Sequence, residues 1–296
     1  MPDEKGLFRT VADLGAYDRI YDDCIATWPL TPEPVFLETP FGRTHCLKIE
    51  QCDGPPLILL HGGQSSSVIW QDMVAGLAKS HRLYALDIPG DYGKSLPAGR
   101  FRGLSPLMGW LTEVMDALQL DRARFLGFSY GGWITLHFCR QHPERVNKAA
   151  LIAPAASFLP LRPAFLLRAI WSMIRPTDKV LRSFYLWASE PACHQNPDYM
   201  ERMLRLVTLV KAGRKSRGIF INPTVFKDDE LQSISVPLVL LIGEHEVIYD
   251  PRKSLDRARR LIPGIETHLV PRASHDLVYA NPGFAVEKIA AFLEKD

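Results

Sequence analysis

The sequence of 296 residues lacks any long run of lysine or arginine, and its 35 basic residues nearly balance its 33 acidic ones. The formal net charge is therefore only +2. Proteins that bind nucleic acids usually concentrate basic residues in a stripe or a patch, often interleaved with aromatic residues. We therefore expect no nucleic-acid partner.

Cysteine is scarce, with five residues and no Cys-x-x-Cys spacing. An odd number of thiols cannot pair completely within one chain. Free thiols fit a reducing compartment, so the cytoplasm is the predicted location. The cysteines are Cys24, Cys46, Cys52, Cys139 and Cys193.

The first residues, Met1 to Gly6, are mostly polar and lead into a charged, mixed segment. They lack the apolar stretch of a secretory signal or a membrane anchor, so we expect no membrane partner. The chain is 47% hydrophobic and 23% charged, which is ordinary for a globular protein that can bury a full core.

Short apolar runs alternate with longer, helix-like stretches. This pattern is typical of an α/β protein with a mostly parallel sheet covered on both faces. A hairpin at 35–38 and 44–49 precedes these runs, which gives eight predicted strands. The runs cover residues 57–60, 83–86, 124–127, 149–152, 236–242 and, more weakly, 266–270.

The alternation stops between residues 157 and 222, where apolar residues recur at helical spacing and no strand run occurs. Further helical stretches are predicted at 179–188 and 198–211. We expect a helical cap at 157–222, inserted into a core domain made of 1–156 and 223–296. Open α/β sheets bind ligands at the carboxyl edge of their strands, where such a cap would lie.

The clearest motif is Gly127-Phe128-Ser129-Tyr130-Gly131. A G-x-S-x-G sequence between a strand and a helix forms a sharp turn that exposes the serine, and glycines two residues away avoid clashes. The helix N-terminus also favours negative charge beside the serine. Ser129 is therefore the predicted nucleophile.

A tetrahedral intermediate needs hydrogen-bond donors for its oxyanion. In this motif, one donor is the N–H after the nucleophile, here that of Tyr130, and another follows an earlier strand. The turn His61-Gly62-Gly63-Gln64 supplies it, with the Gly63 N–H preferred and Gln64 as the alternative. We expect His61 to hold the turn by hydrogen bonding.

A serine nucleophile needs a base, and the base needs an orienting group. Of nine histidines, only His245 and His275 fall in predicted loops after late strands. The motif's chain order of serine, acid and histidine selects His275 as the base.

The acid is expected from the loop at 243–251, where Glu244, Glu246 and Asp250 compete. We predict Glu246, because a turn after Gly243 would direct it back toward the base. Asp250 resembles a helix cap before a proline and stays the alternative. His245-Glu246 does not continue into a zinc motif, because Tyr249 stands where the second histidine would be. We expect no metal and no cofactor.

Taken together, these motifs resemble the bacterial carboxylesterases of the α/β-hydrolase superfamily, from about Tyr21 onward. The resemblance implies an eight-stranded, mostly parallel α/β-hydrolase core with an inserted cap. It also implies Ser129 as nucleophile, Glu246 as acid and His275 as base. The superfamily more often has aspartate at position 246. The matching segments are His61-Gly62-Gly63, 87–95, 127–131, 243–251 and Ser274-His275.

The expected reaction is hydrolysis of a small, apolar carboxylic ester through an acyl-enzyme intermediate. Other activities of the same triad, such as lactonase, thioesterase, perhydrolase or carbon–carbon bond hydrolase, are alternatives, as is a non-catalytic binding protein. A serine at position 129 argues against the dehalogenases and epoxide hydrolases of this fold, which need a carboxylate nucleophile. Aromatic residues of the cap either line the substrate pocket or pack the cap: Phe165, Trp171, Phe184, Tyr185 and Trp187.

Overall fold

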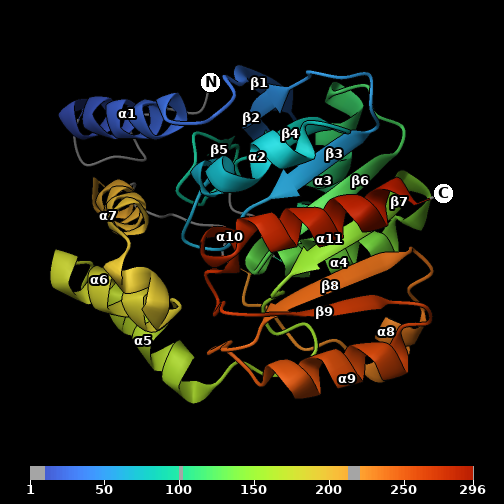
Figure 1. Cartoon of the computed structure of the whole chain (residues 1–296). Coiled ribbons are helices and arrows are strands. Elements are labelled where there is room, and N and C mark those ends of the chain that lie inside the picture. Colours follow the sequence, from blue (N-terminus) through green and yellow to red (C-terminus); the bar gives the residue numbers. More distant parts are fainter. Residues whose placement is uncertain (1–10, 100–102, 213–220, 296) are drawn as a thin grey trace.

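The computed structural model describes residues 11–99, 103–212 and 221–295. Its central sheet runs in the order β1-β2-β4-β3-β6-β7-β8-β9 (Figure 1). The pairs β1–β2 and β2–β4 are antiparallel, and every pair from β4–β3 to β8–β9 is parallel. The strands are β1 (Glu33–Thr39), β2 (Gly42–Ile49), β3 (Pro56–Leu60), β4 (Arg82–Leu86), β6 (Ala123–Phe128), β7 (Val146–Ile152), β8 (Leu238–Gly243) and β9 (Glu266–Val270).

The predicted eight-stranded, mostly parallel sheet is confirmed, with one addition. The two-residue strand β5 (Leu96–Pro97) pairs with the start of β2. A run this short has no period of its own, so the sequence does not predict it.

Alternate residues of each inner strand pack against helices on opposite faces. In β3, Ile58 and Leu60 join one buried cluster, and Leu57 and Leu59 join the other. The first cluster includes α3 (Leu104–Ala117), α4 (Tyr130–Gln141), α8 (Asp228–Gln232) and α9 (Pro251–Leu261). The second includes α1 (Val11–Ala26), α2 (Gln71–Leu77), α10 (Leu277–Ala280) and α11 (Pro282–Glu294).

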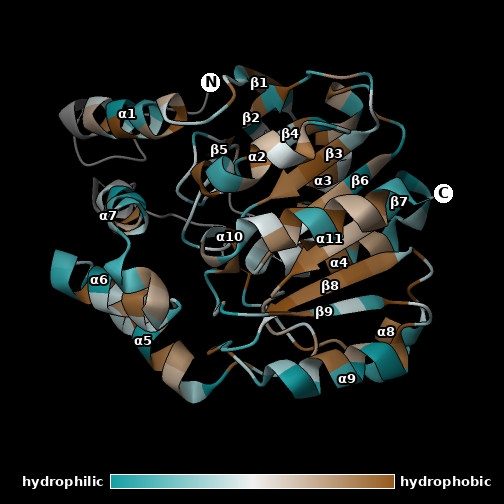
Figure 2. Ribbon diagram, viewed as in Figure 1, coloured by the Kyte–Doolittle hydropathy of each residue, from teal (hydrophilic) through white to brown (hydrophobic). Residues whose placement is uncertain are grey.

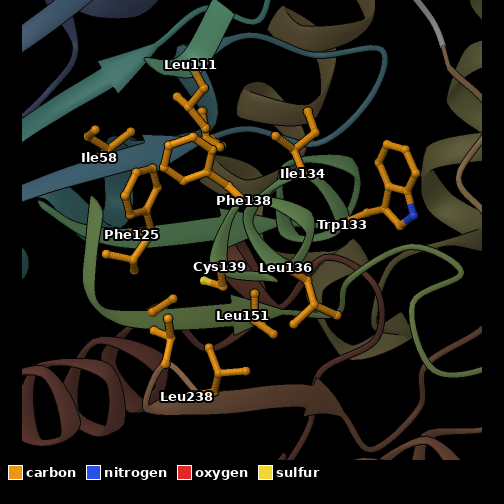
Figure 3. Close-up of a cluster of buried hydrophobic side chains, with 14 of the residues drawn as sticks. Ile58, Leu111, Phe125, Trp133, Ile134, Leu136, Phe138, Cys139, Leu151 and Leu238 are labelled. Carbon is orange, nitrogen blue, oxygen red and sulfur yellow. The ribbon is translucent and has the colours of Figure 1, made fainter. Parts of the chain in front are cut away.

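Figure 3 shows part of the first cluster, where Phe125 of β6 meets Phe138 of α4 at a ring-centroid distance of 5.3 Å. Each fully buried large apolar side chain stabilises the fold by about 1.5–3 kcal/mol. Strands covered on both faces need apolar residues at consecutive positions, which explains the unbroken apolar runs of the sequence.

Helix α1 is absent from the sequence-based expectations. Its buried side chains, Tyr17, Tyr21 and Cys24, recur at helical spacing, but charged residues stand between them. The helix packs on α7 (Pro197–Ala212) of the cap region. The spacing of its buried side chains is that of an amphipathic helix, a signal that the sequence-based expectations did not use, and the stability of the helix depends on the tertiary contacts of that face.

Between β7 and α8 the described chain is helical, with α5 (Pro163–Ile174), α6 (Asp178–Trp187), the short η4 (Pro191–Gln195) and α7 (Figure 1). The N–H of Phe226 donates to the carbonyl of Ser157 at 3.2 Å. This hydrogen bond joins the two ends of the helical segment. Residues 213–220 of the predicted cap lie outside the described residues.

Candidate active site

Ser129 occupies a strained turn between β6 and α4, with φ of 50° and ψ of −110°. A non-glycine residue pays about 1–3 kcal/mol for such a conformation, which persists only where the surroundings enforce it. The flanking glycines make this possible. A Cβ on Gly131 would lie 2.0 Å from the carbonyl oxygen of Leu60, and one on Gly127 would lie 2.4 Å from the carbonyl oxygen of Gly131.

Backbone hydrogen bonds fix the turn at the carboxyl edge of the parallel strands. The Ser129 N–H donates to the carbonyl of Ile152 at 2.8 Å, and the Ala155 N–H donates to the carbonyl of Ser129 at 3.0 Å. Because β7 and the loop after it hold both the N–H and the carbonyl of Ser129, the hydroxyl of Ser129 has a defined position.

The structure brings the three predicted triad side chains together. His275 Nε2 lies 3.0 Å from Ser129 Oγ, and His275 Nδ1 lies 2.9 Å from Glu246 Oε2. The other oxygen of Glu246 accepts the N–H of Ile248 at 3.0 Å. The Glu246 side chain has no exposed surface. A carboxylate in this position holds the imidazole with Nε2 directed at the serine.

The other two carboxylates of the same loop have different partners. Asp250 caps α9, and its Oδ1 accepts the Lys253 N–H at 3.0 Å. Glu244 Oε2 accepts the Arg272 N–H at 3.0 Å. Of the three candidates, Glu246 is the one that contacts His275.

The turn after β3 lies directly beside the serine. A Cβ on Gly62 would be 3.4 Å from the Cβ of Ser129, and the Gly131 N–H donates to the carbonyl of His61 at 3.0 Å. The Gln64 N–H donates to Asp91 Oδ2 at 3.1 Å. Because the Gln64 N–H is already engaged in this hydrogen bond, the geometry favours the N–H of Gly63 as the second oxyanion donor.

His61 holds this turn, as the sequence suggests. Its Nε2 accepts the N–H of Ile88 at 2.9 Å, so the proton lies on Nδ1, which donates to the carbonyl of Gly62 at 2.7 Å. The ring is fully buried, and burial lowers its pKa. A neutral His61 therefore joins the β3 and β4 loops.

A family profile described as alpha/beta hydrolase fold matches residues 55–282. The chain belongs to this family. Its curated relatives include "Uncharacterized carboxylesterase nap" of Bacillus subtilis, 33% identical over 281 residues, which span 95% of this chain and 93% of the relative.

Solved structures agree with the profile. The naproxen esterase (carboxylesterase NP) of Bacillus subtilis is 33% identical, with a TM-score of 0.86 over 95% of this chain and 98% of that one. Carboxylesterase CesB (YbfK) of the same organism is 31% identical, with a TM-score of 0.85 over 96% and 99%. The predicted fold and the resemblance to bacterial carboxylesterases are confirmed.

In this α/β hydrolase, residues from the end of α6 to the first turn of α7 hold the loop that carries His275. The His275 N–H donates to the carbonyl of Ala188 at 3.1 Å. The next residue, Asp276, accepts the Glu190 N–H at 3.1 Å and the Tyr199 hydroxyl at 2.6 Å. Burial raises the pKa of Asp276, although these hydrogen bonds oppose the rise.

A further contact ties the acid's loop to the same segment. His245 Nδ1 lies 2.6 Å from Glu190 Oε2, and this hydrogen bond raises the pKa of His245. We call Ala188, Glu190, Tyr199, His245 and Asp276 the cap network. Sequence reasoning missed it, although the carboxylate directly after the predicted base was a visible signal.

The aromatic residues of the cap differ in their surroundings. Phe165 faces the ring of His275 at 6.5 Å and that of Phe184 at 6.0 Å, and the Tyr185 hydroxyl donates to the carbonyl of Gln64 at 3.3 Å. Trp171 is instead 51% exposed. The last aromatic, Trp187, lies under the Arg168 guanidinium at 4.9 Å. Trp171 therefore takes little part in the packing of the cap, and the Arg175 guanidinium lies over its ring at 5.7 Å.

A second buried polar cluster surrounds Asp87, the residue that directly follows β4. Its carboxylate meets His45 Nδ1 at 2.8 Å, the Tyr21 hydroxyl at 3.0 Å and the N–H groups of Ser67 and Lys94 at 2.8 Å each. Burial opposes ionisation, but these bonds and the neighbouring histidines hold the pKa of Asp87 well below its usual range. The cluster holds residues 87–95 in place and joins α1 to the sheet.

The five cysteines, all within the described ranges, are free thiols. Over residues 11–99, 103–212 and 221–295, no three His, Cys, Asp or Glu side chains are grouped to hold a metal ion. No helix of the described chain is long and apolar enough to cross a membrane.

Proposed function

We propose that this α/β hydrolase is a serine carboxylesterase that uses Ser129 as nucleophile, His275 as base and Glu246 as acid. The observation that carries the proposal is the continuous chain of contacts from Glu246 Oε2 through both nitrogens of His275 to Ser129 Oγ, at 2.9 and 3.0 Å. The relatives named carboxylesterases support the choice of an ester as substrate.

In the acylation step, Ser129 Oγ attacks the ester carbonyl carbon while its proton moves to His275 Nε2. The carbonyl oxygen becomes an oxyanion, and the N–H groups of Tyr130 and Gly63 stabilise it. Collapse of the intermediate expels the alcohol, which takes the proton from His275. Water then repeats the sequence on the acyl-serine and releases the acid. The buried carboxylate of Glu246 stabilises the transient imidazolium in both steps.

We propose a small, apolar ester as the substrate, because Phe165 of the cap faces His275 and packs beside Phe184. The proposed cap is 157–222 and the proposed core is 1–156 with 223–296. The hydrogen bond between Phe226 and Ser157 supports the junction. The odd number of free cysteines favours the cytoplasm as the location.

The test is hydrolysis of a short p-nitrophenyl ester, combined with labelling by a fluorophosphonate. Ser129→Ala is expected to lose about 10⁶-fold in kcat and to lose the label, because the triad acts as a unit. Ser233→Ala is the matched control, because this serine is exposed at the end of α8.

Turnover of the ester by wild type without label on Ser129 would refute the assignment of the nucleophile. Labelling of Ser129 without ester turnover would keep the nucleophile and move the substrate to another acyl compound, such as a thioester or a lactone.

A further inference from the structure

The cap helix α5 exposes most of its large apolar side chains. Nine large hydrophobic residues of the described chain are exposed, and six of them lie on this one helix. Isolated exposed apolar residues are common, but a contiguous group marks an interaction surface. The six are Leu166, Leu167, Ile170, Trp171, Met173 and Ile174.

These six residues form one face. At 100° per residue they span about 160° of the helix surface. The opposite side is narrower and carries Phe165, Ala169 and Ser172, the residues of α5 with the least exposure. Figure 1 shows α5 at the outer edge of the cap, and Figure 2 shows hydrophobic residues along it. We call the six exposed residues the apolar face of α5.

Basic residues border this face. By the same helical spacing, Arg168 lies beside one edge of the face, and Arg162 and Arg175 are the cap residues at the two ends of α5. The following turn and α6 add Lys179 and Arg182, so that residues 162–182 hold five basic residues and one acidic residue. The other residues of the chain hold 30 basic and 32 acidic residues, so the positive charge is concentrated here.

We propose that the apolar face of α5 docks on an anionic lipid surface. An apolar helix face edged by arginine, with tryptophan and leucine in its centre, is the pattern of a helix that lies in the membrane interface. The basic border matches the charge of acidic lipid headgroups. A second copy of this chain fits less well, because a symmetric pairing of α5 would oppose two basic borders.

Such docking is peripheral, and it departs from the sequence-based expectation of no membrane partner. The ring of Phe165 faces His275 at 6.5 Å from the inner side of the same helix. Docking would therefore place α5, the helix that carries Phe165 beside the active site, on the lipid surface. The proposal does not rest on the esterase function, since binding is measured without turnover.

The experiment is co-sedimentation of the full chain with vesicles of phosphatidylcholine alone or with about 30% phosphatidylglycerol. We expect binding to the acidic vesicles that weakens as salt is raised, because screening shortens the reach of the arginines. The double variant Leu167→Ser, Ile174→Ser removes the two most exposed apolar side chains of the face, at 70% and 67% exposure. It is expected to lose at least tenfold in affinity.

Arg168→Gln with Lys179→Gln tests the border, with an expected loss of about fivefold for each charge removed. Val225→Ser is the matched control, because this residue is exposed to 37% but is not part of α5. Its vesicle binding should equal that of wild type. Thermal unfolding reports that each variant is folded.

Failure of wild type to bind acidic vesicles would refute the proposal, as would equal binding to neutral and acidic ones. Sedimentation velocity tests whether a second copy of the chain occupies the face instead. If wild type is a dimer and the Leu167→Ser, Ile174→Ser variant is a monomer, the face binds a second copy and the proposal of lipid docking is overturned.

Discussion

Replacement of Glu246 by glutamine separates the two candidate acids. The carboxylate accepts two hydrogen bonds, from Ile248 N–H at 3.0 Å and from His275 Nδ1 at 2.9 Å. Glutamine has one acceptor and one donor in their place. If its oxygen stays with Ile248, its NH₂ group faces His275 Nδ1. The proton of the imidazole must then move to Nε2, which can no longer accept the proton of Ser129.

The reverse amide orientation sets the NH₂ group against the Ile248 N–H. This leaves a buried donor without an acceptor, at a cost of about 1–3 kcal/mol. In both orientations the negative charge beside the imidazolium is lost. We expect kcat to fall about 10³–10⁴-fold, equivalent to about 4–5.5 kcal/mol in the activation free energy.

The assay is kcat for a short p-nitrophenyl ester, with thermal unfolding to show that Glu246→Gln is folded. Asp250→Ala is the paired variant. It removes the N-cap of α9 and should cost about 1 kcal/mol of stability with no change in kcat. If Glu246→Gln keeps more than a tenth of the wild-type kcat and Asp250→Ala is inactive, the reasoning is refuted and Asp250 is the acid.

Three further variants test the framework. Gly131→Ala should lower the free energy of unfolding by about 3 kcal/mol, because its Cβ would meet a strand carbonyl at 2.0 Å, whereas Gly283→Ala, with open space around it, should not destabilise. An unchanged denaturation midpoint for the first would contradict the predicted clash. Tyr199→Phe should lose about 2 kcal/mol in denaturant unfolding, since it removes a hydrogen bond of the cap network. His245→Gln tests pH dependence: the raised pKa of His245 means that its contact with Glu190 stabilises the fold below about pH 6.5 and fades as pH rises through the folded pKa. The difference in melting temperature from wild type should thus be larger at pH 5.5 than at pH 9, and a difference that grows with pH would contradict the assignment.

Much of the sheet could be predicted because parallel strands buried on both faces leave unbroken apolar runs, as in Leu57 to Leu60. The elbow could be predicted for a related reason. Its requirements, a serine between two glycines after a strand, are all local in sequence. The family comparison confirms the predicted fold.

Other features depend on contacts between distant residues. Glu246 and Asp250 are four residues apart, and the choice between them depends on where the His275 loop lies, 29 residues further on. The hydrogen bond between Tyr199 and Asp276 joins residues 77 positions apart. Helix α1 has apolar residues at helical spacing, but that spacing does not say that they pack against α7 and the sheet domain. The spacing of apolar residues within one segment does not predict such contacts.

The hydrogen bond between Phe226 and Ser157 joins the two ends of the proposed cap, and we expect a different cap grafted at this point to leave the strands in register. The base, however, does not belong to the core alone, because Ala188 and Tyr199 hold the loop on either side of it. A chimaera that exchanges caps to change substrate choice therefore has to keep these two contacts as well. Without them, the new cap would cover the active site but would not hold the His275 imidazole in position.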